Sequence, residues 1–261
     1  QEPTMDSHSP IATVAQALRR AERILVITGA GLSADSGMPT YRGLGGLYNG
    51  RTEEGLPIEA ALSGPMLRRD PALCWKYLAE LGKACLAARP NAGHEAIAEL
   101  QKHKPECWVL TQNIDGFHRQ AGSPARAADR DPWRTGAALL PVPAVPRAAA
   151  WRSICTASCR RVGAACGGVL RPPVVLFEEM LPEEAIDTLY RELRKGFDAV
   201  LVVGTTASFP YIVEPVLRTR QAGGFTAEVN PGVTDLSERV DVKMTGRALD
   251  IMPQVVSHIY R

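Results

Sequence analysis

The sequence of 261 residues lacks any uninterrupted apolar run near the roughly 18 residues that a membrane-spanning helix needs. It also lacks an excess of either charge, because 30 basic and 28 acidic side chains leave a net charge of +2. Neither a nucleic-acid partner nor a membrane is therefore expected. The first ten residues contain no basic segment followed by an apolar run, so a cytoplasmic protein is expected. Nothing in the sequence indicates an oligomeric state.

Paired cysteines are also missing from most of the chain. Cys74, Cys85 and Cys107 have no paired spacing and are predicted to fill the core. The six cysteines are expected to be buried thiols or metal ligands rather than disulfides. His94 and His118 lie on predicted helices among apolar neighbours. We interpret both as packing or surface histidines rather than proton carriers.

The sequence does contain a regular alternation of β-branched runs and helical patterns. Strands are predicted at 24–28, 107–110, 174–177, 199–204 and 225–230, and helices at 11–23, 71–88, 92–103, 183–195 and from residue 211 onward. Such a series forms a parallel sheet with helices on both faces. The sequence therefore predicts an α/β protein with a doubly wound parallel sheet.

Ligands of such sheets lie beyond the carboxyl ends of the strands, where the segments beginning at Gly29, Gln112, Gly204 and Asn230 are expected. Glycines at 29 and 31 allow a tight turn and a close approach of the backbone to a ligand. Ser33 is predicted to cap a helix whose first amides face a pyrophosphate. By itself a Gly-Ala-Gly turn is equally typical of a strand-to-helix junction without a ligand.

Five motifs occur together in a particular order. They are GAGLSADSGMPTYRG (29–43), TQNIDGFHRQAG (111–122), GGVLRPPVVLFEEMLP (167–182), VVGTTASFP (202–210) and EVNPG (228–232). In this order they resemble the bacterial-type sirtuins, which are NAD-dependent protein lysine deacylases. The resemblance covers about residues 10–122 and 166–255. It implies a Rossmann-like NAD-binding domain together with a smaller module that binds zinc in the family.

The resemblance also implies the roles of particular residues. Asn113 and Asp115 are the expected catalytic residues, and Gln112 is expected to bind nicotinamide and its ribose with them. The full set expected to contact NAD is Gly29, Ala30, Gly31, Ser33, Tyr41, Arg42, Gln112, Asn113, Asp115, Gly204, Thr205, Thr206 and Asn230, of which the last four are expected around the adenosine half. For an isolated strand-to-helix junction, Asn113 and Asp115 would more readily be caps of a helix beginning at Gly116. Only the combination of motifs reverses that preference.

The reaction implied by the resemblance converts acetyl-lysine and NAD into lysine, nicotinamide and O-acetyl-ADP-ribose, with a histidine as general base. In the family this histidine lies in a segment of the type IEIHG shortly after TQNID. This sequence has no histidine between His118 and His258. The chain as written is therefore expected to be impaired in catalysis.

The zinc site implied by the resemblance needs two Cys-x-x-Cys pairs. The corresponding region has only Cys155, Cys159 and Cys166, with unsuitable spacing. Of these, only Cys166 lies where the last family ligand falls. NAD is thus the expected cofactor, and a complete zinc site is not expected. Three thiols with histidine or water as the fourth ligand are the remaining alternative.

Residues 123–165 contain no lysine, glutamate or histidine and are rich in alanine, arginine and proline. This composition is typical of GC-rich DNA translated in the wrong frame. Reading the codons of 129–137 one base later permits Ile-Glu-Ile-His-Gly, with the histidine codon spanning Pro132 and Trp133. Two further single-base insertions, near Pro143 and Gly163, permit both cysteine pairs and restore the frame. We predict a frame-shifted translation, and the alternative is a genuine insertion in a diverged family member.

The resemblance places the substrate near Val174, Phe177, Leu78 and Leu81. Acid-selective members of the family carry Tyr and Arg at the positions of Leu78 and Leu81, so an apolar acyl pocket is predicted. Where the family has Gly after Phe, this sequence has Glu178. The charge is expected to weaken binding of the substrate peptide.

The predicted domain organisation is an NAD-binding domain over 1–122 and 167–261, with a small and aberrant module over 123–166. The predicted function is that of an NAD-dependent deacetylase acting on acetyl-lysine proteins or peptides. An inactive protein that binds NAD or ADP-ribose is the second hypothesis. An NAD-dependent oxidoreductase is a remote third.

Overall fold

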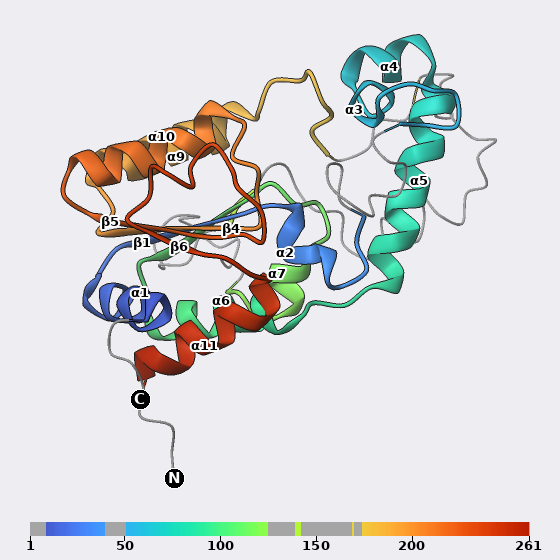
Figure 1. Ribbon diagram of the computed structural model, residues 1–261. Coiled ribbons are helices and arrows are strands. Elements are labelled where there is room, and N and C mark those ends of the chain that lie inside the picture. Colours follow the sequence, from blue (N-terminus) through green and yellow to red (C-terminus); the bar gives the residue numbers. More distant parts are fainter. Residues whose placement is uncertain (1–8, 40–50, 125–138, 142–168, 170–173, 261) are drawn as a thin grey trace.

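The computed structural model describes residues 9–39, 51–124, 139–141, 169 and 174–260 (Figure 1). The helices are α1 (Pro10–Arg20), α2 (Ala30–Ala34), α3 (Ile58–Ala61), α4 (Gly64–Arg69), α5 (Pro71–Ala87), α6 (Ala92–His103), α7 (Phe117–Gln120), α9 (Glu183–Lys195), α10 (Pro210–Gln221) and α11 (Ala248–Tyr260). The strands are β1 (Ile24–Thr28), β2 (Cys107–Thr111), β3 (Leu139–Pro141), β4 (Ala199–Val203), β5 (Phe225–Val229) and β6 (Val242–Met244). In this described part, no helix has the length and apolar character to cross a membrane.

The strands form one parallel sheet in the order β3-β2-β1-β4-β5-β6. Ile24 is level with both Cys107 and Ala199, so the three central strands begin and end together. This is the doubly wound order, and the predicted fold class is confirmed. The chain moves outward in one direction from β1 to β3 and in the other from β4 to β6. The point of reversal lies between β1 and β4, and doubly wound sheets bind ligands beyond the carboxyl ends of the strands at such a point.

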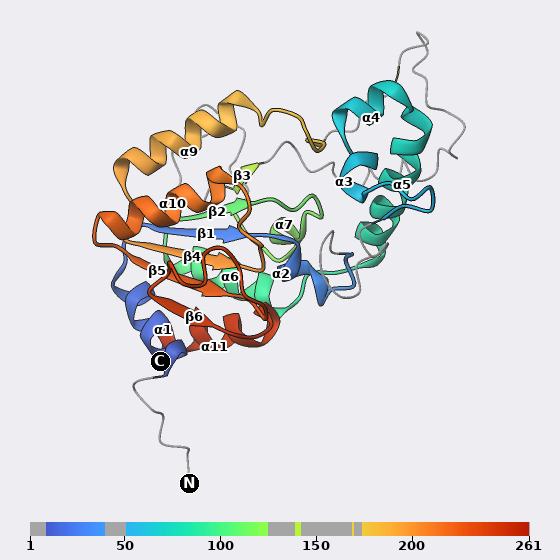
Figure 2. The ribbon, with the colours of Figure 1, turned by 45° about the horizontal axis from the view of Figure 1, so that its top comes forward.

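Helices cover both faces of the sheet (Figure 2), and an apolar layer lies between each set of helices and the sheet. Alternate residues of a strand point to opposite faces, and in β1 Ile24 and Val26 pack with α1, α6 and α11. Leu25 and Ile27 pack on the other face with α9 and α10. Burial on both faces explains why the central strands read as continuous apolar runs.

Local signals in the sequence account for the helix boundaries. The Ser9 hydroxyl accepts a hydrogen bond from the Ala12 amide (3.2 Å), and Pro10 occupies the first turn of α1. Asn91 and His94 form a reciprocal capping box at the start of α6. Helix α9 has two glutamates in its first turn and basic residues in its last, which complements the helix dipole.

Most predicted elements are confirmed, and one is wrong. The structure gives β1, α6 and α9 the predicted bounds, and most of the other predicted boundaries agree within one residue. Helix α1 is shorter than predicted, since it ends at Arg20 rather than Arg23. The run from Val174 to Phe177 is not a strand of the sheet. It forms an isolated parallel bridge to Ser63 instead. Its apolar side chains are buried against α5, which produces the same sequence pattern as a sheet strand.

A third apolar cluster lies apart from the sheet, where Figures 1 and 2 both show α3, α4 and α5 projecting to one side. It is built around Tyr77 and Leu78 of α5, with Met66 of α4 and Val174 against them. Residues 125–138 and 142–168 lie outside the described part of the chain. The predicted domain boundaries at 123 and 166 therefore stay a prediction.

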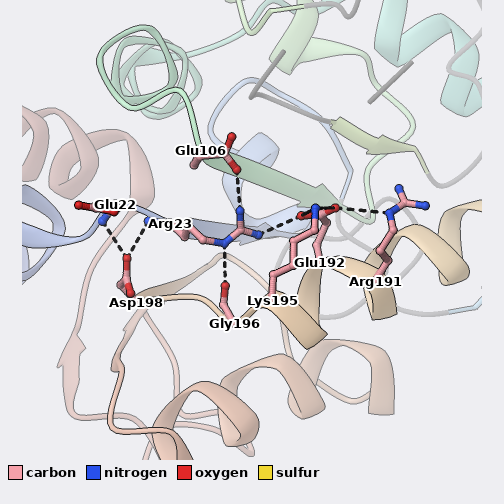
Figure 3. Close-up of polar contacts among 8 residues, drawn as sticks. All are labelled: Glu22, Arg23, Glu106, Arg191, Glu192, Lys195, Gly196 and Asp198. Atoms are coloured by element: carbon pink, nitrogen blue, oxygen red, sulfur yellow. Dashed lines mark hydrogen bonds and ion pairs between the residues drawn. The ribbon is translucent and has the colours of Figure 1, made fainter. Parts of the chain in front are cut away.

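At the amino ends of the strands, a set of charged groups joins β1, β2, β4 and α9 (Figure 3). We call Glu22, Arg23, Glu106, Arg191, Glu192, Lys195, Gly196 and Asp198 the amino-end cluster. The Arg23 guanidinium donates to Glu106 (2.7 Å), to Glu192 (2.9 Å) and to the Gly196 carbonyl (2.8 Å). One Asp198 oxygen accepts from the backbone amides of Glu22 and Arg23 (2.9 and 2.8 Å). The cluster ties the starts of the central strands together.

Candidate functional site

The loops that follow β1 and β4 lie in close contact at the point of strand reversal. The Gly31 amide donates to the Gly204 carbonyl (2.8 Å). A Cβ at Gly29 would lie 2.6 Å from the Thr205 Cβ, and one at Gly31 would lie 2.8 Å from the Gly204 oxygen. Close packing of two loops therefore requires both glycines. The contact between the two loops is thus a structural reason for these glycines, in addition to the predicted close approach of the backbone to a ligand.

Ser33 lies inside α2, and the prediction that it caps a helix is wrong. The N-terminal cap position is Gly29, which has no side chain to accept a hydrogen bond. Instead, the buried Ser33 hydroxyl donates to Asp115 Oδ2 (2.7 Å). The Asn113 side-chain amide donates to Ser33 Oγ (3.2 Å) and to the Gly29 carbonyl (3.0 Å). Ser33 thus joins the loop after β1 to the loop after β2.

His94 completes this arrangement from α6. Its Nε2 lies 3.2 Å from Ser33 Oγ, and its Nδ1 accepts from the Asn91 backbone amide (3.2 Å). Because the single Ser33 proton goes to Asp115, these contacts require the tautomer with hydrogen on Nε2. Burial lowers the pKa of His94 to about 4. The ring is neutral near pH 7 and orients Ser33.

Asp115 has two structural roles at once. Its Oδ1 accepts from the Phe117 amide at the start of α7 (2.9 Å), while its Oδ2 accepts from Ser33. The N-cap of α7 is Gly116, so neither Asn113 nor Asp115 is the cap residue, although Asp115 accepts from the first amide of α7 from the position before the cap. Burial raises the pKa of Asp115, and the hydrogen bonds from Phe117 and Ser33 oppose that rise. Asn113 Oδ1 accepts no hydrogen bond from the described residues and remains available to a ligand.

His118 of α7 is buried beside the same site. Its Nε2 lies 2.9 Å from the Thr28 hydroxyl at the end of β1. Burial lowers its pKa to about 3, with a further contribution from the nearby His94 ring. Nδ1 has no partner among the described residues. Burial confirms the packing interpretation of both histidines, but the sequence did not indicate that they contact Ser33 and Thr28.

A second set of side chains lies beyond β4 and β5. The Asn230 amide donates to the Thr205 carbonyl (3.0 Å), and the Thr205 hydroxyl donates to Gln112 Oε1 (2.7 Å). The Gln112 amide donates in turn to the Tyr211 hydroxyl (3.2 Å). Gln112 therefore lies with the residues expected on the adenosine side. Tyr211 was not predicted, although its position in the first turn of α10, just after VVGTTASFP, was a usable signal.

The expected substrate residues are also brought together. Leu78 and Leu81 of α5 are buried in one cluster with Val174, and Phe177 packs on its edge. Ile114, which lies between Asn113 and Asp115, packs against the same cluster. The predicted acyl-binding residues therefore adjoin the predicted NAD-binding residues.

Three expected site residues, Tyr41, Arg42 and Cys166, lie outside the described residues. Thr206 is exposed and follows Thr205. Cys74, Cys85 and Cys107 are buried thiols, as predicted. Within the described ranges no group of three or more His, Cys, Asp or Glu side chains is placed to hold a metal ion.

The model of the Sir2 family matches residues 29–130 and 140–210. The chain belongs to the Sir2 family. The match includes 123–130 and 140–165, which lie outside the predicted resemblance, but it does not extend to 10–28 or to 211–255. It omits 131–139, a stretch that includes most of the segment read above as a shifted Ile-Glu-Ile-His-Gly.

Relatives in the Sir2 family cover nearly the whole chain. A Pseudomonas aeruginosa protein named NAD-dependent protein deacylase 2 is 86% identical over 268 aligned positions, covering 98% of this chain and 100% of the relative. A protein of the same name from Pseudomonas syringae pv. tomato is 59% identical, covering 94% and 98%. A solved mutant Sir2 homologue in complex with 2′-O-acetyl ADP ribose superposes with a TM-score of 0.76 at 28% identity, covering 98% of this chain and 97% of that one.

Proposed function

We propose that this chain is an NAD-dependent protein deacylase of the sirtuin type. The observation that carries the proposal is the Ser33–Asn113–Asp115 arrangement at the strand reversal point, beside an apolar cluster that can receive an acyl chain. A dehydrogenase would need a site that retains the nicotinamide, and no observation favours one here. The names of the two Pseudomonas relatives support the deacylase proposal.

The residues present fit NAD. At the carboxyl end of β1, where a doubly wound sheet binds pyrophosphate, the Ala30 amide donates to no described residue, whereas the Gly29 and Gly31 amides donate to the carbonyls of Val203 and Gly204. Asn113 Oδ1 offers an open acceptor to a ribose hydroxyl, while Ser33 and Asp115 hold the Asn113 loop in place. Thr205, Asn230 and Gln112 line the adenosine side. When bound, NAD supplies the ribose carbon to which the acyl oxygen is transferred.

No described histidine is suited to act as the general base. A base works best when its pKa lies near the operating pH, and burial lowers the pKa values of His94 and His118 to about 4 and about 3. His103 and His258 lie in the last turns of α6 and α11. The contact of the His258 carbonyl with Arg19, near the end of α1, places α11's last turn away from the site. This specific observation favours the second candidate function, an NAD-binding protein without turnover, for the chain as written.

A restored reading frame reconciles the two candidate functions. The frame-restored protein would be the deacylase, and the chain as written would be the NAD-binding protein without turnover. The unusual composition of 123–165, which has no lysine, glutamate or histidine, supports the proposal that the coding sequence is shifted there. Resequencing the DNA that encodes 122–166 tests it, because an intact frame would leave a genuine insertion as the explanation.

NAD binding can be tested without turnover. In calorimetric titration with NAD or ADP-ribose, we expect the chain to bind and Asn113→Ala to weaken the affinity at least about tenfold, since the ligand contact is lost together with the hydrogen bonds to Ser33 and Gly29 that hold the loop. Gln254→Ala, an exposed change on α11, is the control and should bind as the parent does. Absence of binding by folded protein would contradict the proposal.

The acyl group is proposed to be acetyl or a longer aliphatic chain. Leu78 and Leu81 provide no cation, and a succinyl carboxylate left unpaired among apolar side chains is strongly disfavoured. In the frame-restored protein, kcat/KM for an acetyl-lysine peptide should exceed that for the matched succinyl peptide by more than about tenfold. Similar values for the two peptides would exclude an apolar acyl pocket.

A further inference from the structure

A turn formed by residues 176–179 has an unusual third residue. The Glu179 amide donates to the Leu176 carbonyl (3.2 Å), which closes a β-turn. Glu178 has a φ of 63°, whereas Phe177 is not among the described residues with positive φ. This is the pattern of a type II turn, whose third position favours glycine because a side chain there is strained. An exposed glutamate occupies it in this chain.

The turn is held firmly, so the position of Glu178 is defined. The Phe177 amide donates to the Leu62 carbonyl and the Gly64 amide donates to the Phe177 carbonyl, both at 3.0 Å. The Glu179 carboxylate turns back to accept from the Leu176 amide (2.9 Å). The Glu178 side chain has no hydrogen bond or ion pair with any described residue.

The place of the turn is next to the substrate residues. Phe177 packs on the cluster that contains Leu78, and Ile114 reaches the same cluster from the loop that carries Asn113 and Asp115. Glu178 is therefore one residue away from the apolar wall that adjoins the proposed NAD site. A peptide whose acyl chain enters that cluster leaves its flanking residues near the turn.

The surrounding segment is acidic. From Val174 to Tyr190 the sequence has five acidic side chains and no basic one. Besides Glu178, the exposed members are Glu183, Glu184 and Asp187. Like charges add to the local negative potential, which attracts cations and repels acidic peptides.

We propose that Glu178 is a specificity-determining residue that selects acyl-lysine peptides with arginine or lysine beside the modified lysine. This rests on the proposed function and names the substrate class of the same site. A strained backbone at a functional surface persists when the surroundings hold it in place, and glycine would relieve the strain. A contact between substrate and the Glu178 carboxylate, which has no partner among the described residues, would explain why glutamate rather than glycine occupies this strained position. An exposed ion pair of this kind discriminates about two- to fivefold.

The test compares two acetyl-lysine peptides that differ only in having arginine or glutamine on both sides of the modified lysine. Their dissociation constants are measured by fluorescence anisotropy with ADP-ribose present, at low ionic strength where surface charges are least screened. The proteins are the parent, Glu178→Gln and Glu184→Gln. Glutamine keeps the size of the side chain, and Glu184→Gln removes the same charge from the first turn of α9.

We expect the parent and Glu184→Gln to prefer the arginine peptide about two- to fivefold, and Glu178→Gln to bind the two peptides nearly equally. An unchanged preference in Glu178→Gln would overturn the proposal. An equal loss in both variants would also overturn it, because the general field of the segment would then be responsible. The proposed function is judged separately, by whether the frame-restored protein releases nicotinamide with either peptide.

Discussion

The two ends of the parallel sheet are built from different chemistry. At the amino ends of the strands, the amino-end cluster joins neighbouring elements with charged groups (Figure 3). At the carboxyl ends, glycines and neutral hydrogen-bonding groups join the same strands, and Asp115 is the buried carboxylate among them. Both ends connect β1, β2 and β4. They differ in which polar groups each end leaves available to a ligand.

At the amino end, the buried charge is satisfied by other charges. The Glu192 side chain is 3% exposed and is paired with Arg23 and Lys195. Burial raises the pKa of Glu192, but hydrogen bonds from Lys195 and Arg23 outweigh that effect and hold the pKa below its usual range. Such an end stabilises the fold.

The carboxyl end keeps hydrogen-bond acceptors available to a ligand and carries few bulky side chains. Glycines allow the loops after β1 and β4 to touch, and buried neutral histidines hold Ser33 and Thr28 without adding charge. In this arrangement backbone amides, rather than charged side chains, supply the positive partial charge that favours a bound pyrophosphate. The comparison shows that the absence of bulky and charged side chains shapes the site as much as the residues that are present.

The largest effect is expected when a methyl group is added at the carboxyl end. Gly204→Ala places a Cβ 2.3 Å from the Leu32 amide nitrogen, and the φ of 63° adds strain. We expect the free energy of unfolding to fall by about 3 kcal/mol, with loss of NAD binding. Gly232→Ala is the control, because its nearest neighbour lies at 3.7 Å. Equal denaturant midpoints for the two variants would show that the loops are not tightly packed.

A smaller effect is expected at the amino end. Arg23→Ala removes three hydrogen bonds and leaves the buried Glu192 with Lys195 and Arg191. Because partners remain, we expect a loss of about 2 kcal/mol rather than the roughly 3 to 5 kcal/mol of a fully orphaned charge. Urea unfolding measures the loss, and calorimetry should show unchanged NAD affinity. A large loss of affinity would mean that the two ends are not independent.

The buried histidines predict how stability depends on pH. Folding lowers the pKa of His94 from 6.5 to about 4 and that of His118 from 6.5 to about 3. The unfolded chain therefore binds more protons below pH 6.5, and stability present above that pH is lost as the pH falls. Each histidine contributes at most about 1.4 kcal/mol per pH unit. Asp115 acts in the opposite sense, because burial raises its pKa.

His118→Gln removes one of these two contributions. We expect the slope of unfolding free energy between pH 6 and pH 5 to fall by about half, as measured by denaturant titration at each pH. His103→Gln is the control, because the side chain is half-exposed and paired with Glu99. An identical slope in His118→Gln would show that this ring is protonated without cost.

The smallest effect is expected from an exposed member of the amino-end cluster. The Glu106 side chain is 46% exposed, although its distance to Arg23 is only 2.7 Å. Glu106→Gln should cost about 0.5 kcal/mol or less in urea unfolding, because solvent screens an exposed pair. A cost equal to that of Arg23→Ala would place the stabilising contact at Glu106 instead of Glu192.

Sequence patterns predicted the elements whose signals are local. Strand β1 is a β-branched run that ends at glycine, and α6 begins with Asn91 as its cap, so both were located to the residue. The run from Val174 to Phe177 was misread because an apolar run buried against a helix has the same pattern as a sheet strand. Nothing in the local sequence distinguishes the two partners.

The sequence predicted which residues belong to the candidate site, but only part of how they are arranged. Motif order identified Asn113 and Asp115, whereas the contact between Gly31 and Gly204 joins segments more than 170 residues apart in the chain. The places of Ser33 inside α2 and of His94 against it depend on such long-range packing. Neither is visible in the spacing of a single segment.

The most direct test of the account is nicotinamide release, measured on the chain as written and on a chain with the reading frame of 123–165 restored. The account predicts that the restored protein releases nicotinamide only when acetyl-lysine peptide is present, about 10² to 10⁴ times faster than the chain as written. Equal rates would contradict it. The segment as written would then supply its own base, and the assignment of the missing histidine would be wrong.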